Sequence, residues 1–373
     1  MGVYAIPIKV GLIIFPIIAF IITIPYMIKQ YHKFGSIPFL RTVIVYSFVL
    51  YLLIAWFMVI LPLPKIDDVA KMTTPWTQLI PFDFIREIKD ATSFNILDIS
   101  TYVSTLKSPA VYTVLFNFVL TLPFGVYLRY YFNRKWWEVL VMSFMLSLFF
   151  EITQISGLFG IYPRPYRLFD VDDLIVNTTG GFLGYLLTPL FSKILPTREE
   201  LDSKAYDKGK RVSFPRRFIA DLIDLVIVCL ISFSGLFNKY TLDLSILMLM
   251  YLMYFIILTI FFNGRTIGKL IVGIRVVNNE EKRAKPYQLL IRYTTKYILY
   301  FEIFYVLFYL DNLESLGNIG IFITIMFLVT LSFIYTKTII NAFNKKIPLV
   351  YEQFSKTKHI STIKYKNKTK EEN

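Results

Sequence analysis

The stretch between residues 151 and 184 holds a high density of polar side chains between two apolar segments. Its acidic, basic and amide residues are Glu151, Gln154, Arg164, Arg167, Asp170, Asp172, Asp173 and Asn177. A charged side chain at membrane depth costs about 2.5 kcal/mol or more on insertion scales, so such groups usually face a bundle interior or a watery cavity. This stretch is therefore the first candidate for a functional site.

Helical spacing predicts which of these side chains lie together. Positions at steps of three and four share one helical face, as do Asp173, Asn177, Gly180 or Gly181, and Gly184. Glu151 and Gln154 share a face near the end of the preceding helix. Because glycine allows close backbone approach, we expect the two helices to join their polar faces beneath a short loop.

The residue types in this stretch suit several kinds of chemistry. Glu151 paired with Asp173, or with Asp170, provides an acid and a base if apolar surroundings keep one carboxyl neutral. The planar guanidinium groups of Arg164 and Arg167 suit a phosphate group. The predicted catalytic pair is Glu151 and Asp173, and the predicted substrate-binding residues are Gln154, Arg164, Arg167, Asp170 and Asn177.

Two alternatives accompany this prediction. The carboxylates of Asp170, Asp172 and Asp173 are hard oxygen ligands that would suit Mg²⁺ or Ca²⁺, and no other cofactor is expected. In a purely structural alternative, Arg167 binds Asp170 or Asp173, Asn177 hydrogen-bonds Glu151, and the cluster only locks two helices together.

The composition indicates an all-α polytopic membrane protein. Hydrophobic residues make up 55% of the 373 positions and charged residues 18%, and the mean hydropathy is +0.56. Apolar runs of about 20 residues recur, and each is long enough to span a bilayer. They predict about nine transmembrane helices in two bundles, five and then four.

The net charge of +14 is concentrated in particular loops and the tail, which points to membrane topology and not to nucleic-acid binding. Basic residues gather at 29–41, 129–135, 193–217, 264–292 and beyond Lys337. If these segments are cytoplasmic, the N-terminus lies outside, the C-terminus inside, and the loop 159–172 outside. We therefore expect a multi-pass membrane protein with membrane lipids as partners.

Polar runs divide the chain. Residues 1–195 form a predicted five-helix membrane domain, 196–216 a cytoplasmic polar linker, 217–340 a four-helix membrane domain, and 341–373 a basic cytoplasmic tail. We expect the tail to be mobile and to associate with anionic lipid headgroups. The second membrane domain opens with Arg217, Asp221 and Asp224 on one helical face.

Two family resemblances rest on these motifs. The order Glu151, Gln154, Arg167, Asp170, Asp173, Asn177, Gly180, Gly184 resembles the VanZ-like family over about residues 5–195. The order Arg217, Asp221, Asp224, Thr266, Gly268, Lys269, Gly273, Arg275, Arg292 resembles the RDD family over about 212–340. The first resemblance implies a cell-envelope protein linked to lower susceptibility to the glycopeptide teicoplanin. The second implies a membrane domain for which transport has been suggested.

These observations favour an outward-facing site that binds or processes an envelope glycolipid or lipid-linked precursor, with a glycopeptide as another possible ligand. Transport of an ion or solute through Glu151, Asp221 and Asp224 is an alternative, and a non-enzymatic scaffold or sensor is another. The sequence leaves open whether the site is catalytic. The polar residues gather at opposite ends of the helices and not along a path, which disfavours transport.

Overall fold

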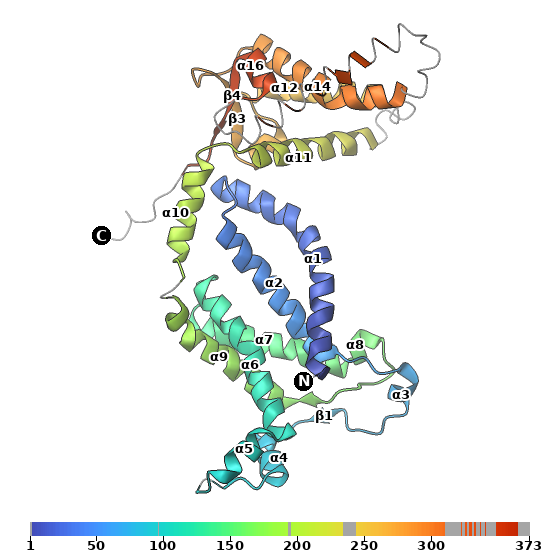
Figure 1. Cartoon of the computed structure of the whole chain (residues 1–373), viewed down its shortest axis with the longest axis vertical. Helices are drawn as coiled ribbons and strands as arrows, with labels where there is room; N and C mark the ends of the chain where they lie inside the picture. The colour runs from blue at the N-terminus through green and yellow to red at the C-terminus, as the bar shows by residue number, and fades with distance from the viewer. Residues whose placement is uncertain are drawn as a thin grey trace, which may run out of the picture. The chain divides into compact units, whose positions relative to one another are not determined.

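The computed structural model describes residues 2–95, 97–192, 195–233, 244–309 and 348–364, with single positions between 322 and 340. The described chain is mostly helical (Figure 1) and divides into two compact units. One comprises Met1–Ile22 and Phe39–Leu201, and the other Thr23–Pro38 and Asp202–Asn373. The long first helix, α1 (Gly2–Phe34), contributes to both.

Four helices in the described residues are long and apolar enough to cross a membrane. They are Ala5–Phe34 within α1, α2 (Phe39–Ile60), α6 (Pro109–Tyr130) and α7 (Trp136–Ile155). This finding confirms a helical membrane protein. The apolar run 319–335, which would be the last of the nine predicted helices, falls mainly outside the described residues.

The first unit is built around the close packing of α6 against α9 (Val171–Ser192), which lie side by side in Figure 1. A side chain at Gly125 of α6 would overlap the carbonyl oxygen of Gly181. A side chain at Gly180 or Gly184 of α9 would overlap a carbonyl oxygen of α6. The predicted close approach of helices through glycine therefore exists. Gly180 and Gly184, however, pack against α6, and of the three glycines only Gly181 faces Ser143 of α7.

The long segment between α2 and α6 is tied to the N-terminus of α9. It contains α3 (Ile66–Ala70), β1 (Thr77–Gln78), α4 (Asp83–Ala91) and α5 (Ser100–Leu106). Strand β1 pairs in parallel with β2 (Phe169–Asp170), which follows the short helix α8 (Gly157–Gly160). The sequence of residues 81–90 is compatible either with a short amphipathic helix or with an ordered loop, and α4 occupies most of this stretch. Its first turn is fixed because the Asp172 carboxylate accepts the N–H groups of Phe82 and Phe84 at 2.5 and 2.9 Å.

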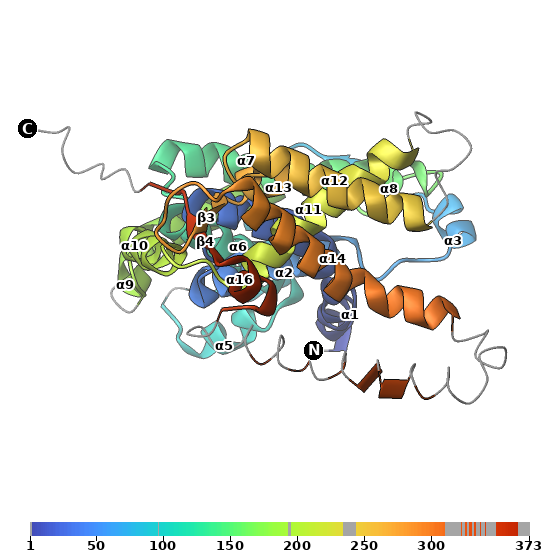
Figure 2. The ribbon, with the colours of Figure 1, turned by 90° about the horizontal axis from the view of Figure 1, so that it is seen from above.

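The second unit contains α11 (Phe214–Phe233), α12 (Leu244–Phe261), α13 (Ile267–Ile271), β3 (Ile274–Asn278), α14 (Pro286–Tyr309), α16 (Val350–Ser355) and β4 (Thr357–Ser361). Helix α10 (Arg198–Gly209) lies within the predicted polar linker. Strands β3 and β4 lie side by side (Figure 2) and pair antiparallel, from Ile274 with Ser361 to Asn278 with Thr357.

This pairing corrects the expectation of a mobile tail for residues 348–364. Tyr351 is 1% exposed and Glu352 4% exposed, so α16 contributes to the core of the second unit. The tail as a whole is basic, but it contains a short segment, α16, whose apolar and acidic side chains are buried. The last nine residues, 365–373, lie outside the described residues.

Candidate functional site

A cavity of about 260 Å³ lies in the first unit, within the stretch singled out from the sequence. Its walls come from α2, α6, α7, α9 and the start of α1. The apolar lining residues are Pro7, Met58, Val59, Leu61, Phe116, Leu120 and Phe150. The polar lining residues are Thr113, Asn117, Glu151, Gln154, Arg167, Asp173 and Asn177. An apolar wall thus meets a cluster of carboxyl and amide groups.

Glu151 lies near the C-terminal end of α7 and is 1% exposed. Its Oε2 atom accepts a hydrogen bond of 2.8 Å from the backbone N–H of Asp170, just before α9. Within the described chain, Oε1 accepts no hydrogen bond. Gln154, one turn further along α7, lines the same cavity. The helical spacing therefore correctly placed Glu151 and Gln154 on one face.

Asp173 is held by a residue that the sequence analysis did not single out. The Asn117 amide of α6 donates a 2.6 Å hydrogen bond to Oδ1 of Asp173. The other carboxylate oxygen, Oδ2, makes no hydrogen bond with any described residue. Asn117 is the only amide side chain of the mainly apolar α6, and a lone amide at that depth is a sequence signal that would have identified it.

Asn177 carries an unsatisfied polar atom into the cavity. Its Nδ2 donates to Ser147 Oγ at 3.0 Å, while Oδ1 is buried and has no hydrogen-bond partner among the described residues. Exchanging the two ends of the amide would leave Nδ2 without an acceptor instead, so one amide group is unsatisfied in either assignment. A buried polar group without a partner costs about 1–3 kcal/mol, which a polar ligand would offset.

The two arginines of the predicted phosphate site are separated. Arg167 lines the cavity, where its Nη2 donates to the carbonyl oxygen of Leu61 at 2.8 Å. Arg164 is not part of the lining: it hydrogen-bonds the carbonyl oxygen of Thr74 and stacks on Trp76. A paired guanidinium clamp is therefore not assembled in the cavity.

The acidic residues before α9 serve local structure. Asp170 Oδ1 accepts the N–H of Asp172 at 2.8 Å, and Asp172 fixes the start of α4. Burial raises the pKa of Asp170, as does the negative charge of Asp172, while that N–H lowers it. Where residues are described, no three His, Cys, Asp or Glu side chains gather to hold a metal ion.

The structural alternative also differs from what is observed. Arg167 forms no ion pair with Asp170 or Asp173 in the part of the chain that is described, and Asn177 bonds Ser147 instead of Glu151. Helices α7 and α9 are linked through that serine and through Asp170. The polar side chains that line the cavity are thus held by neighbouring residues, and several of their polar atoms make no hydrogen bond with a described residue.

The second unit holds a separate cluster of buried charges. Asp224 is fully buried, and its carboxylate accepts hydrogen bonds from Tyr254, Thr266 and the N–H of Gly268, at 2.8, 2.5 and 2.7 Å. Nearby, Lys296 Nζ lies 2.6 Å from Asp221. Lys269 lies 3.8 Å from Asp221 and 3.9 Å from Asp224, so two lysines offset two aspartates.

The remaining predicted residues of this unit lie apart from that cluster. Arg217 Nη1 pairs with Glu352 Oε2 of α16 at 3.0 Å and not with an aspartate. Arg275 lies in β3 opposite Ile360, and its Nε atom has no hydrogen-bond partner in the described parts of the chain. The predicted sharing of one face by Arg217, Asp221 and Asp224 does not produce an arginine–aspartate pair.

Glu352 is the centre of a second buried network. It accepts from Arg217 and lies 3.3 Å from Arg292 and 3.0 Å from His359 Nδ1. Burial alone would raise the pKa of Glu352, but the His359 hydrogen bond and the two guanidinium charges lower it well below its usual range. Burial and the charge of Arg292 lower the pKa of His359, so its ring is neutral at pH 7.

Arg216 is another residue that the sequence analysis missed. It is fully buried, and it donates to the carbonyl oxygens of Val272, Gly209 and Gly273 at 2.8–2.9 Å. The adjacent Arg217 lies four residues before Asp221 and therefore shares a helical face with the aspartates. Nothing else in the local sequence indicates that Arg216 is the buried arginine. Only the fold shows that Arg216 joins α10, α11 and the start of β3.

Comparison with known proteins agrees with this division. Residues 48–192 match the family model described as VanZ/LLP1, and residues 211–346 match that of the RDD family. The chain joins a VanZ-like region to an RDD region. The resemblance stated from the sequence is thereby confirmed in both halves. No curated protein and no solved structure gives a significant match.

The matched ranges locate the two groups of residues. Apart from Pro7, the residues that line the cavity fall within the VanZ-like region. Asp221, Asp224, Lys269 and Lys296 fall within the RDD region. Glu352 and His359 lie beyond residue 346, where the RDD match ends, so the second buried network joins the RDD region to a following segment.

Proposed function

We propose that the VanZ-like region binds the polar headgroup of a cell-envelope glycolipid or lipid-linked precursor in the cavity around Glu151, Asp173 and Asn177. Both matched families point to a membrane protein of the cell envelope. The proposal includes nine membrane crossings in a bacterial plasma membrane, with the N-terminus and the cavity on the outer side. The positive-inside distribution of lysine and arginine supports this orientation.

The unsatisfied amide of Asn177, beside unused oxygens of Glu151 and Asp173, is the observation that carries the proposal. Binding sites typically combine an apolar wall with a few placed polar groups, and this cavity has both. A ligand with a polar head and an apolar stem would fit such a lining. The apolar wall would take the first carbons of the stem.

The charges of the lining favour a headgroup rich in hydroxyl or amine donors. Two carboxyl groups face the cavity, against one arginine that is already bonded to Leu61. Because Arg164 lies elsewhere, a phosphate group would meet more acidic than basic groups. The cavity of about 260 Å³ is somewhat smaller than typical drug-sized pockets of roughly 300–1,000 Å³, so it holds one sugar-sized unit and not a whole lipid.

The proposed step is binding, with Glu151 and Asp173 as its acceptors of hydrogen bonds. A divalent cation at Asp170, Asp172 and Asp173 is not included, because Asp172 is directed at the backbone of Phe82 and Phe84. Holding envelope glycolipid headgroups would alter the surface that a lipid-bearing glycopeptide meets. Lower susceptibility to teicoplanin is the phenotype that this proposal expects.

We do not extend the proposal to transport. Asp224 accepts three hydrogen bonds, and Asp221 is paired with Lys296, so both carboxylates are engaged. A scaffold or sensor role also lacks a specific observation in its favour. The cavity is the feature that offers unused binding groups.

The test measures lipid retention by the full-length protein. The protein is placed in nanodiscs of phosphatidylcholine with a minor fraction of diglucosyl diacylglycerol, and retained lipids are counted by native mass spectrometry. We expect selective retention of the glycolipid, reduced about tenfold by Asp173→Asn or Asn177→Leu, since each removes or blocks a buried polar contact. Asp98→Asn, an exposed substitution in a turn, is the matched control.

Each result has a definite meaning. Equal retention of glycolipid by all variants would overturn the proposal. A loss of folded protein in both cavity variants would instead assign these residues to helix packing. Selective loss of glycolipid, with unchanged melting temperature, supports binding at this cavity.

A further inference from the structure

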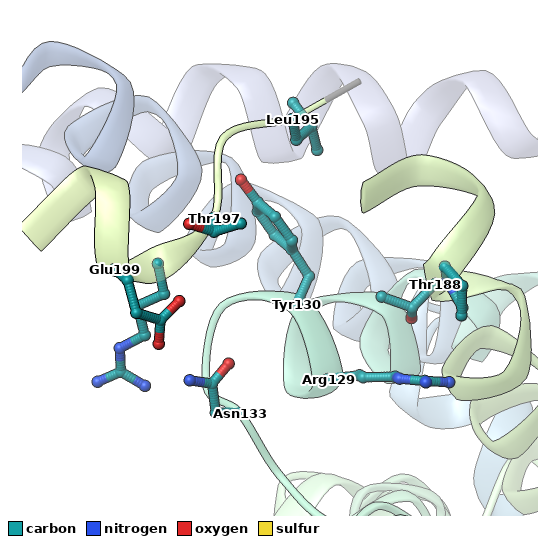
Figure 3. A pocket seen from close by; sticks show the side chains of 9 residues that line it. Arg129, Tyr130, Asn133, Thr188, Leu195, Thr197 and Glu199 are labelled. Atoms are coloured by element: carbon teal, nitrogen blue, oxygen red, sulfur yellow. The ribbon is translucent and has the colours of Figure 1, made fainter. Parts of the chain in front are cut away.

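The two ends of α6 carry different side chains. At the C-terminal end, mainly polar and charged groups line a second cavity of about 290 Å³. Figure 3 shows Arg129 beside Thr188 at one end of this cavity and Asn133 and Glu199 at the other, so these groups do not converge on one ligand. At the N-terminal end, where α4 and α5 lie (Figure 1), large apolar side chains are exposed instead.

The exposed face of α5 is apolar. Ile99, Val103 and Leu106 follow steps of four and three, so they share one helical face. Their exposed fractions are 79%, 61% and 58%, whereas Thr105, on another face of the same helix, is buried. Apolar side chains thus point outward and a polar one points inward, which is the reverse of a helix that faces water.

Other parts of the segment between α2 and α6 also expose large apolar side chains. The most exposed of them is Leu97, at 90%, and the others lie at the start of α4: Leu79, Ile80, Phe82 and Ile85. Surfaces that face water carry such side chains singly, and their accumulation marks a contact with a membrane or another protein. The segment therefore has a partner that covers its apolar side chains.

The position of α5 identifies this partner. Two residues separate Leu106 from Pro109, where α6 begins, and α6 is long and apolar enough to cross a membrane. Its exposed Tyr112, Leu115 and Val119 follow at steps of three and four, so the apolar face of α5 is continued along the chain by a lipid-facing one. Because α5 is only about 10 Å long, all of it lies close to the headgroup layer of the bilayer that α6 crosses.

We propose that the apolar face of α5, formed by Ile99, Val103 and Leu106, docks on the surface of the lipid bilayer beside the N-terminal end of α6. Interfacial helices bury such a face about 5–10 Å deep, at the boundary between headgroups and acyl chains. Asp98 and Lys107 flank the face with opposite charges, so burial of apolar surface, and not attraction to anionic lipid, drives the contact. The contact is independent of the ligand in the cavity around Glu151.

The test measures the surroundings of a fluorescent label on this face. The full-length protein with Cys229→Ala and either Val103→Cys or Ser104→Cys is labelled with a nitrobenzoxadiazole probe and placed in phosphatidylcholine vesicles. Ser104 is the matched control, because it is the adjacent residue, is also exposed and lies on a different helical face. We expect phosphatidylcholine with a spin label at acyl carbon 5 to quench the label at 103 several-fold more than the label at 104, and aqueous iodide to show the opposite order.

The other positions of the face separate docking from a general collapse of the segment. Labels at Ile99→Cys and Leu106→Cys should behave like the label at 103, because lipid contact follows the helical period. Equal quenching of the labels at 103 and 104 by both reagents would overturn the proposal. A label at 103 that neither reagent reaches would also overturn it, because a second copy or another part of the protein would then cover the face.

Discussion

The Asn117 side-chain amide and the Asp173 carboxylate are joined by a 2.6 Å hydrogen bond between α6 and α9. The bond fixes Oδ1 of Asp173, whereas Oδ2 makes no hydrogen bond with a described residue. It also makes α6, and not only α7 and α9, part of the candidate site.

Asn117→Ala should weaken glycolipid retention and destabilise the first unit. A hydrogen bond to a charged group contributes about 1.5–3 kcal/mol, so the melting temperature should fall measurably. In a double-mutant cycle, Asn117→Ala and Asp173→Asn should be non-additive. Additive losses would mean that the two side chains do not depend on each other.

Gly184→Ala should disrupt the contact between α6 and α9. The added Cβ would overlap the carbonyl oxygen of Leu122, so the two helices would have to separate. We expect a destabilisation of about 1–3 kcal/mol, as for overpacked cores, measured as a lower melting temperature. Thr179→Ala, at an exposed position of the same helix, is the control and should change little.

Asp172→Asn should weaken the attachment of α4 without changing the lining of the cavity around Glu151. The carboxylate that accepts the Phe82 and Phe84 N–H groups would become a weaker acceptor. Limited proteolysis should then cut the 79–95 region faster. If cleavage rates match those of the unsubstituted protein, the cap is not what holds this segment.

Glu352→Gln should destabilise the second unit strongly. It would leave the buried Arg292 and the half-buried Arg217 without their carboxylate, and removing one partner of a buried ion pair costs roughly 3–5 kcal/mol. Thermal unfolding in detergent measures the effect. Glu281→Gln, which removes an exposed pair with Lys358, serves as the comparison and should have little effect.

The second unit should lose stability as the pH falls below about 6.5, the ordinary pKa of histidine. The pKa of His359 is lowered in the folded protein, so the unfolded chain takes up the proton first. Melting temperatures between pH 8 and 5 should therefore decline for the original protein. In His359→Gln the part of the decline due to this ring should vanish, and an unchanged slope would contradict the assignment.

The sequence predicted those features that follow from local periodicity. Glu151, Gln154, Asp173 and Asn177 were grouped correctly because steps of three and four fix a helical face. Arg164 was grouped with them by proximity in the chain, yet a loop residue has no such constraint, and its side chain turns to Thr74.

The spacing of residues along the chain does not predict contacts between elements that are far apart in the sequence. Asn117 meets Asp173 only because α6 and α9 pack through glycine. Glu352 meets Arg217 across 135 positions, and no spacing rule links the two residues. In both cases the partner is selected by packing between elements and not by a local pattern.

The pairing of β3 with β4 sets an order of events during synthesis. Ile274 reaches its partner Ser361 only after the 86 intervening residues, which include α14, have left the ribosome. Until then, Arg217 and Arg292 have no Glu352 to neutralise them. The second unit therefore completes its fold only after residue 361 has been synthesised.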